Sequence, residues 1–202
     1  MITIVNYGMG NLGSMLNMFK RLGVPASIES DPEVIRSAEK LILPGVGAFD
    51  TAMKCINDRP GLRQALDHKA MVDSVPVLGV CLGMQLLTQS SEEGQLPGLG
   101  WVPGTTLRFP RQGSLKVPHM GWNIAKPTRS SSLTADFDSE PRFYFVHSFY
   151  VSVNDPTHSL MRTNYGMEFD SAIGRDNIYG VQFHPEKSHR FGMQILKNFA
   201  GL

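Results

Sequence analysis

A cysteine flanked by glycines stands at the most informative point of the sequence. The segment Gly79-Val80-Cys81-Leu82-Gly83 has the pattern G-x-C-x-G and lies between an apolar run and a helical pattern. Such a strand-to-helix turn lifts a nucleophile to the edge of a sheet, and the free amides of the next helical turn favour thiolate over thiol. Cys81 is therefore predicted to be a nucleophile. Cys55 has no such context and is predicted to be a core or surface thiol.

The base for this nucleophile is predicted in the segment Val181-Gln182-Phe183-His184-Pro185-Glu186. A cysteine that forms an acyl intermediate needs a base to take its proton, and the base needs an orienting partner. His184 ends a strand-like run, Pro185 stops the strand, and Glu186 follows closely enough to hold one imidazole nitrogen. Taken alone, the segment is equally consistent with a histidine at a strand end beside a salt-bridged glutamate.

Acyl transfer also needs hydrogen-bond donors for the negative oxygen that develops on the substrate. The backbone N–H of Leu82, directly after the cysteine, is one candidate. The turn Gly45-Val46-Gly47 is another, because its glycines allow the N–H groups at Val46 and Gly47 to point inward. Without Cys81, the same turn would be interpreted as an ordinary glycine-rich connection.

The elements that position these residues follow a parallel α/β pattern in the first half of the chain. Short apolar runs alternate with longer helical patterns, which is typical of βαβ units around a parallel sheet. The last of these runs, 75–80, is apolar on both faces, as expected of a central parallel strand. Predicted strands cover 2–5, 26–29, 40–43 and 75–80, and predicted helical patterns lie at 12–22, within 49–69 and at 82–87.

From Gly94 onward, turn residues and shorter alternating runs predict antiparallel strands. The stretch 128–140 is rich in Ser, Thr and Asp and predicts a surface loop. The whole chain, 1–202, is thus predicted to be a single α/β domain with a mostly parallel central sheet and an added antiparallel portion. Predicted strands in this half cover 105–108, 115–117, 121–124, 143–146, 150–153 and 178–182, and the last helix covers 190–199.

The composition excludes several classes of function. Of 202 residues, 42% are hydrophobic, and nineteen basic against eighteen acidic residues give a formal net charge of +1, so nucleic acid and anionic membranes are not expected partners. The two cysteines, the strand-like start after Met1 and the lack of a roughly 20-residue apolar run lead us to expect a cytoplasmic protein. No metal or organic cofactor is expected, because the histidines lack the spacing of a metal site.

Two motifs of the chain resemble those of the class I (triad) glutamine amidotransferases. These are Gly79 to Gln85, in the form GxCxGxQ, and His184-Pro185-Glu186. The resemblance spans nearly the whole chain and narrows to the branch that forms the glutaminase subunit of imidazole glycerol phosphate synthase. The segments that carry it are Asn6-Tyr7-Gly8-Met9-Gly10-Asn11-Leu12, Pro44-Gly45-Val46-Gly47-Ala48-Phe49, Pro118-His119-Met120-Gly121-Trp122-Asn123 and Tyr144-Phe145-Val146-His147-Ser148.

The resemblance implies a three-layer α/β/α, flavodoxin-like fold and a glutaminase that makes glutamate and ammonia through a cysteine thioester. It also implies a heterodimer in which a (βα)8-barrel cyclase receives the ammonia for histidine biosynthesis. The chain ends 16 residues after Glu186, so we expect the ammonia acceptor on another polypeptide. The residues implied to hold glutamine are Gln85, Glu93, His147, Ser148 and Phe149, and those implied to face the partner are Met120, Trp122, Tyr144 and Lys187.

Three alternatives remain open. The first is a paralogue of the same glutaminase that feeds a similar barrel protein in another pathway, such as amidination of a surface sugar. The segments 6–8, 14–20 and 188–193 resemble those of such paralogues. A cysteine hydrolase of the same fold often has histidine directly after the cysteine, where this chain has Leu82. A partner module without catalysis would have no chemical need for Cys81, His184 and Glu186 together.

Overall fold

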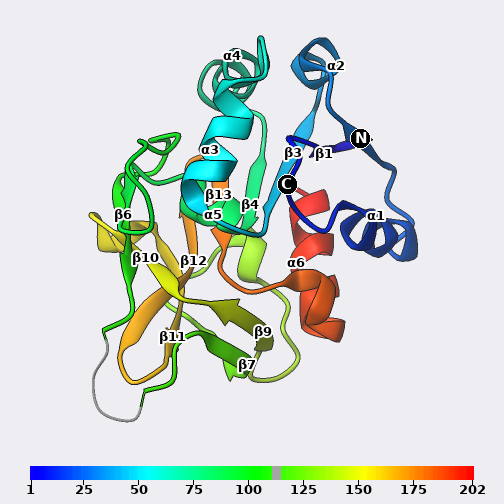
Figure 1. The fold of residues 1–202 in the computed structure, drawn as a ribbon. Helices are drawn as coiled ribbons and strands as arrows, with labels where there is room; N and C mark the ends of the chain where they lie inside the picture. Colours follow the sequence, from blue (N-terminus) through cyan, green and yellow to red (C-terminus); the bar gives the residue numbers. More distant parts are fainter. Residues whose placement is uncertain (111–114) are drawn as a thin grey trace.

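The computed structural model describes residues 1–110 and 115–202, and its centre is one long sheet (Figure 1). Within the described residues this sheet has 11 strands, with the order β2-β1-β3-β4-β13-β12-β10-β6-β5; β11 pairs with β12, and β8 pairs with β11. The strands are β1 (Ile2–Val5), β2 (Ala26–Glu29), β3 (Lys40–Gly45), β4 (Val77–Cys81), β5 (Ser90–Ser91), β6 (Gly104–Arg108), β8 (Lys126–Pro127), β10 (Phe149–Val153), β11 (Ser159–Asn164), β12 (Glu168–Arg175) and β13 (Ile178–Val181).

The sheet changes direction between β13 and β12. From β2 to β13 all neighbouring strands run parallel, whereas β12 pairs antiparallel with β13 and β10 pairs antiparallel with β12 and β6. A separate two-stranded ribbon is formed by β7 (His119–Ile124) and β9 (Arg142–His147). The predicted mostly parallel sheet with an antiparallel addition is thus confirmed.

Helices cover both faces of the parallel part, which gives the three layers that the resemblance implies (Figure 1). One face carries α1 and α6 and the other carries α3, α4 and α5, each over its own apolar core. Strand β3 serves both cores, because Leu41 and Leu43 belong to one and Ile42 to the other. The helices are α1 (Leu12–Arg21), α2 (Pro32–Arg36), α3 (Phe49–Asn57), α4 (Leu62–Asp67) with a wider turn at His68–Val72, α5 (Leu82–Leu86) and α6 (His189–Ala200).

The structure corrects one sequence prediction and adds one element that was not predicted. The stretch 115–117 is not a strand, and pairing begins only at His119, because Pro118 has no N–H to donate to a ladder. The hairpin of β11 and β12 was not predicted, although β12 lies inside the main sheet. Positions 111–114 lie outside the described residues. No helix in the described part of the chain is long and apolar enough to cross a membrane.

Candidate functional site

Cys81 sits at a sharp turn where β4 ends and α5 begins. Its φ of 55° lies in the left-handed region that side chains rarely adopt. The flanking glycines are required by close packing: a Cβ on Gly79 would lie 2.6 Å from the Gly83 oxygen, and a Cβ on Gly83 would lie 1.8 Å from the Leu43 oxygen. The G-x-C-x-G pattern therefore brings β3, β4 and α5 closer together than side chains at these positions allow.

This packing predicts a large loss of stability in Gly83→Ala. The added methyl group would overlap the Leu43 carbonyl, which is backbone and cannot rotate away. We expect the free energy of unfolding to fall by about 2 kcal/mol or more, measured by urea denaturation. Gly13→Ala is the matched control, because a Cβ at Gly13 in α1 meets nothing within 4 Å. That variant should be neutral or slightly stabilised, and equal losses in both variants would contradict the packing argument.

His184 lies at the same edge of the sheet as Cys81, because β13 runs parallel to β4 with Val181 opposite Val80. Its Nδ1 is 2.8 Å from Glu186 Oε1, and both side chains are buried. Burial alone would lower the pKa of His184, but the neighbouring Cys81 sulfur and Glu186 carboxylate outweigh it and raise the pKa to about 10. The arrangement thus favours a protonated imidazole beside the sulfur.

The backbone around the histidine is held by the ribbon of β7 and β9. The His184 N–H donates to the Tyr144 oxygen at 2.9 Å, and Ser188 Oγ donates to the His184 oxygen. Ser188 Oγ also accepts from the Tyr144 N–H at 3.0 Å. Ser188 is fully buried, so its hydroxyl locks the turn after His184 to β9.

A cleft of about 380 Å³ opens in front of the cysteine. Its lining contains every residue predicted for catalysis, for the oxyanion and for glutamine, except Glu186, which contacts His184 from behind. It also contains Lys187, predicted to face a partner, together with Pro118 and Val146. The predicted residues in the lining are Val46, Gly47, Cys81, Leu82, Gln85, Glu93, His147, Ser148, Phe149 and His184.

Gln182 is a site residue that the sequence analysis did not single out. It is fully buried, its Oε1 accepts from Gln85 Nε2 at 3.2 Å, and its Nε2 lies 3.8 Å from Cys81 Sγ. The signal was present, since a residue two positions before His184 points to the same face of an extended chain. Gln85 itself is buried and not solvated, because its Nε2 also donates to the Phe149 oxygen at 3.2 Å.

Glu93 enters the cleft from the loop after β5. Burial raises the pKa of Glu93, while its carboxylate accepts from the Phe49 N–H at 3.1 Å. The loop is anchored by Asp50 at the start of α3, which accepts from the N–H groups of Gln95 and Leu96. Those two backbone hydrogen bonds lower the pKa of Asp50. A carboxylate held by a backbone N–H thus lines the same cleft as the cysteine.

Two buried histidines of the β7–β9 ribbon predict a loss of stability in mild acid. Burial lowers the pKa of His147 to about 3 and that of His119 to about 4. Below the ordinary pKa near 6.5, both histidines become protonated in the unfolded chain but stay neutral in the folded chain. The stability that is present above pH 6.5 is therefore lost as the pH falls toward 4. His184 adds only a small slope of the opposite sign there, because below pH 6 it is largely protonated in the unfolded chain and fully protonated in the folded one.

We therefore expect the free energy of unfolding to fall by roughly 2 kcal/mol per pH unit between pH 6 and pH 5, measured by urea denaturation. His119→Asn should reduce this slope, because asparagine does not titrate there. A slope that is the same in both proteins would contradict a neutral histidine at position 119.

The residues predicted to face a partner gather beside the cleft. Met120 and Trp122 are 61% and 49% exposed on the outer face of β7. Trp122 stacks on His189 with 5.3 Å between ring centroids and meets the Tyr144 ring edge-on. The Lys187 ammonium lies 5.7 Å from the centre of the Tyr144 ring. An exposed aromatic and cationic surface therefore borders the mouth of the cleft.

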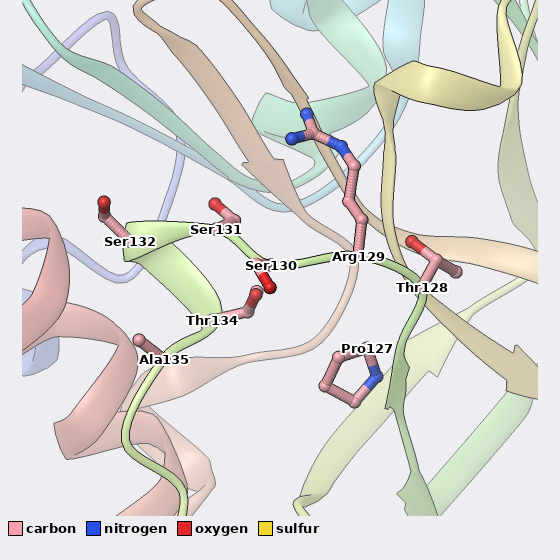
Figure 2. Close-up of a pocket in the computed structure, with 8 residues that line it drawn as sticks. All are labelled: Pro127, Thr128, Arg129, Ser130, Ser131, Ser132, Thr134 and Ala135. Atoms are coloured by element: carbon pink, nitrogen blue, oxygen red, sulfur yellow. The ribbon is translucent and has the colours of Figure 1, made fainter.

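A larger hollow of about 740 Å³ lies along the loop from Pro127 to Ala135 (Figure 2). Figure 2 shows the Arg129 side chain rising from the loop, and its Nη2 donates to the Gly174 oxygen. None of the described residues that line this hollow is a cysteine, histidine or carboxylate. Nor do the described residues contain a group of three or more His, Cys, Asp or Glu side chains suited to a metal ion. The smaller cleft is therefore the candidate active site.

Comparison with known proteins places this chain in a family. The model of the family "Glutamine amidotransferase class-I" matches residues 3–201. Imidazole glycerol phosphate synthase subunit HisH of Bdellovibrio bacteriovorus is 50% identical over 203 residues, covering 99% of each chain. Subunits named HisH 2 from Methanococcus maripaludis and Pseudomonas aeruginosa are 51% and 50% identical, covering 98% and 100% of each chain.

Solved structures agree with the fold. A crystal structure of a glutamine amidotransferase superposes with a TM-score of 0.77 at 17% identity and covers 100% of this chain and 99% of that one. PurLQS from Thermotoga maritima gives a TM-score of 0.76 at 17% identity, covering 99% of this chain and 97% of that one. At such identities these structures support the fold alone. The family match and the relatives show that the chain belongs to the class I glutamine amidotransferases and, within them, to the HisH subunits of imidazole glycerol phosphate synthase.

Proposed function

We propose that this chain is the glutaminase subunit of imidazole glycerol phosphate synthase and that Cys81, His184 and Glu186 are its catalytic residues. One observation carries the assignment of the site: a strained cysteine, a His–Glu pair and the residues expected to hold glutamine line or border a single cleft. The larger hollow along 127–135 has neither a cysteine nor a histidine among its described lining residues.

The reaction follows from this geometry. His184 holds the proton of Cys81, and the thiolate attacks the side-chain amide carbon of glutamine. This gives a tetrahedral intermediate. Its oxyanion is bound by backbone N–H groups at Leu82 and at the turn Val46–Gly47. The C–N bond then breaks, the His184 proton leaves with the nitrogen as ammonia, and a thioester remains on Cys81. Water attacks the thioester with His184 as base, which releases glutamate and restores the thiol.

Glutamine is recognised by groups already fixed in the cleft. The Glu93 carboxylate suits the α-ammonium group of the substrate, because it lines the cleft and is held there by the Phe49 N–H. Gln85 and the backbone around His147, Ser148 and Phe149 form another part of the lining, joined by the hydrogen bond from Gln85 to the Phe149 oxygen. These groups are polar and, at Gln85, buried, so they orient the substrate at little further cost in side-chain entropy.

The partner is a (βα)8-barrel cyclase, docked on the surface formed by Met120, Trp122, Tyr144 and Lys187. Large exposed side chains such as Trp122 and Met120 are typical anchors of protein interfaces. Because Lys187 also lines the cleft, the same surface borders the exit through which ammonia would pass to the partner. The two proteins would form a heterodimer in histidine biosynthesis.

The test is a titration of glutamate release against the cyclase subunit carrying its ribonucleotide substrate. We expect the isolated chain to be a poor glutaminase, because the turn Gly45–Gly47 can hold its amide away from the substrate until the partner docks. Gly47 has a φ of 108°, a conformation that only glycine adopts readily and can readily leave. Fast hydrolysis by the chain alone would contradict this expectation.

A second candidate is the supply of ammonia to a similar barrel protein in another pathway. One observation favours it: two of the relatives near 50% identity are named HisH 2, as a second copy would be. The triad makes ammonia identically in both cases, so only the partner distinguishes them. Activation by a histidine-pathway cyclase supports the first function, and activation only by another barrel protein, identified by co-purification, supports the second.

A further inference from the structure

Two histidines face each other in the β7–β9 ribbon, and the proposed chemistry uses neither as acid or base. His119 and His147 are directly opposite in the register of the two strands, and both are buried. His119 Nδ1 lies 2.9 Å from His147 Nε2. Two imidazoles at this distance can share only one proton between these nitrogens, so the direction of the hydrogen bond is informative.

The neighbouring groups fix that direction. His147 Nδ1 is 2.7 Å from the Phe149 carbonyl oxygen, which can only accept, so Nδ1 carries a proton. Burial keeps the pKa of His147 near 3, so at neutral pH its Nε2 is bare and accepts from His119 Nδ1. His119 Nε2 in turn accepts from Asn123 Nδ2 at 3.2 Å, and that amide also donates to the Asn164 oxygen at 2.9 Å.

The resulting chain of hydrogen bonds ends in the cleft. The Phe149 oxygen that accepts from His147 also accepts from Gln85 Nε2. Gln85 Nε2 is bound to Gln182 Oε1 as well, and Gln182 Nε2 lies 3.8 Å from Cys81 Sγ. A continuous network, buried from His119 inward, therefore joins Asn123 on β7 to the wall of the cleft and to the nucleophile. Such networks fix geometry only when every member is satisfied.

The His119 ring is held by packing as well as by hydrogen bonds, and these two interactions can be tested separately. It stacks on Tyr165 with 4.0 Å between centroids and on Phe145 with 4.7 Å. A phenyl ring can reproduce this stacking but offers no nitrogen, whereas an asparagine amide can reproduce the Nδ1 donor without the ring. The chain thus offers a pair of variants that distinguish hydrogen bonding from packing.

We propose that His119 is a positioning residue for glutamine hydrolysis, which fixes the Phe149 carbonyl and Gln85 through His147. The proposal rests on the proposed function and deepens it. Without the donor at His119, the imidazole of His147 loses its only partner at Nε2 among the described residues and can turn, which releases the Phe149 oxygen that orients Gln85. The expected consequence is weaker binding of glutamine, with the chemistry at Cys81 largely retained.

The experiment measures kcat and KM for glutamine with the cyclase subunit present at saturation, in wild type and three variants. His119→Phe should raise KM about tenfold and change kcat by less than about threefold, since one buried hydrogen bond is lost. His119→Asn should stay within about threefold of wild type in both constants. Tyr165→Phe is the matched control: it keeps the ring against His119 and removes only the hydrogen bond to the Lys116 oxygen. It should leave KM unchanged.

A second readout separates positioning from damage to the fold. Alkylation of Cys81 by iodoacetamide requires the thiolate but not the glutamine pocket, and its rate in His119→Phe should stay within about twofold of wild type. An unchanged KM in His119→Phe, or equal losses in the Phe and Asn variants, would overturn the proposal. So would a parallel fall in kcat and alkylation. Absence of glutamate release by wild type would instead overturn the proposed function, and this proposal with it.

Discussion

Cys81→Ala is expected to lower kcat for glutamine hydrolysis by at least about 10⁴-fold, because removal of a covalent nucleophile leaves only binding and oxyanion stabilisation. The structure gives a reason to expect little compensation. Cys81 occupies the strained turn at φ 55°, and it is the cysteine in the lining of the cleft that also contains His184 and Gln85. The measurement is glutamate release in the saturated complex, with the binding of glutamine checked separately by calorimetry.

The chain supplies its own control for this variant. Cys55→Ala removes the other thiol, which is partly buried against the α3 side of the sheet and outside the cleft. We expect that variant to keep kcat within about twofold of wild type, with a modest loss of stability from the smaller side chain. Residual activity in Cys81→Ala above a few per cent, or silence in Cys55→Ala, would show that the nucleophile is assigned wrongly.

The parallel half of the fold was predictable because its strands carry a local signal. Buried parallel strands such as β4 are apolar on both faces, and their ends are marked by glycine turns. The strand at 40–43 was predicted two residues short, since Pro44 and Gly45 look like a turn but continue β3 opposite Val80 and Cys81. That extension could not be inferred locally, because it depends on the neighbouring strand.

The antiparallel half was less predictable because long-range pairing decides it. Strand β12 contains Glu168, Asp170 and Ser171, a polar composition that argues against a strand inside a sheet. The structure accommodates Asp170 by pairing its carboxylate with Arg162 of β11 and with the Val153 N–H. Val153 is distant in the sequence, and Arg162 lies on the other strand of the hairpin. The sequence alone therefore did not show that the Asp170 carboxylate would find these partners.

The catalytic motifs were predictable because each is local, whereas the network that supports them is not. G-x-C-x-G and His-Pro-Glu are short segments with a chemical logic of their own. The contact of His119 with His147 instead depends on the register of two strands separated by a long loop. Gln182 belongs to the non-local network, but it could have been identified locally. It stands two residues before His184, and alternate residues of a strand point to the same face.

Glu186→Gln is expected to lower kcat by about 10³-fold, because the amide can still orient the imidazole but cannot stabilise its charge. In wild type the Glu186 carboxylate, together with Cys81, raises the pKa of His184 to about 10 against the opposing effect of burial. Without the carboxylate, the effect of burial is less strongly opposed, so the pKa of His184 falls. Less imidazolium then stands beside the sulfur, so the rate of Cys81 alkylation by iodoacetamide should fall below that of wild type, and more so as the pH rises above 7.

The raised pKa of His184 also predicts how the stability of the protein depends on pH. A histidine whose pKa is raised on folding contributes stability that is fully present below its unfolded pKa near 6.5 and is lost as the pH rises toward 10. The free energy of unfolding of wild type should therefore exceed that of Glu186→Gln most at pH 6, and the difference should shrink steadily toward pH 10. Glu168→Gln, an exposed glutamate 3.8 Å from Arg162, is the control and should show neither effect. A stability difference that does not change with pH would mean that Glu186 only orients the ring, and that the charge on His184 has another source.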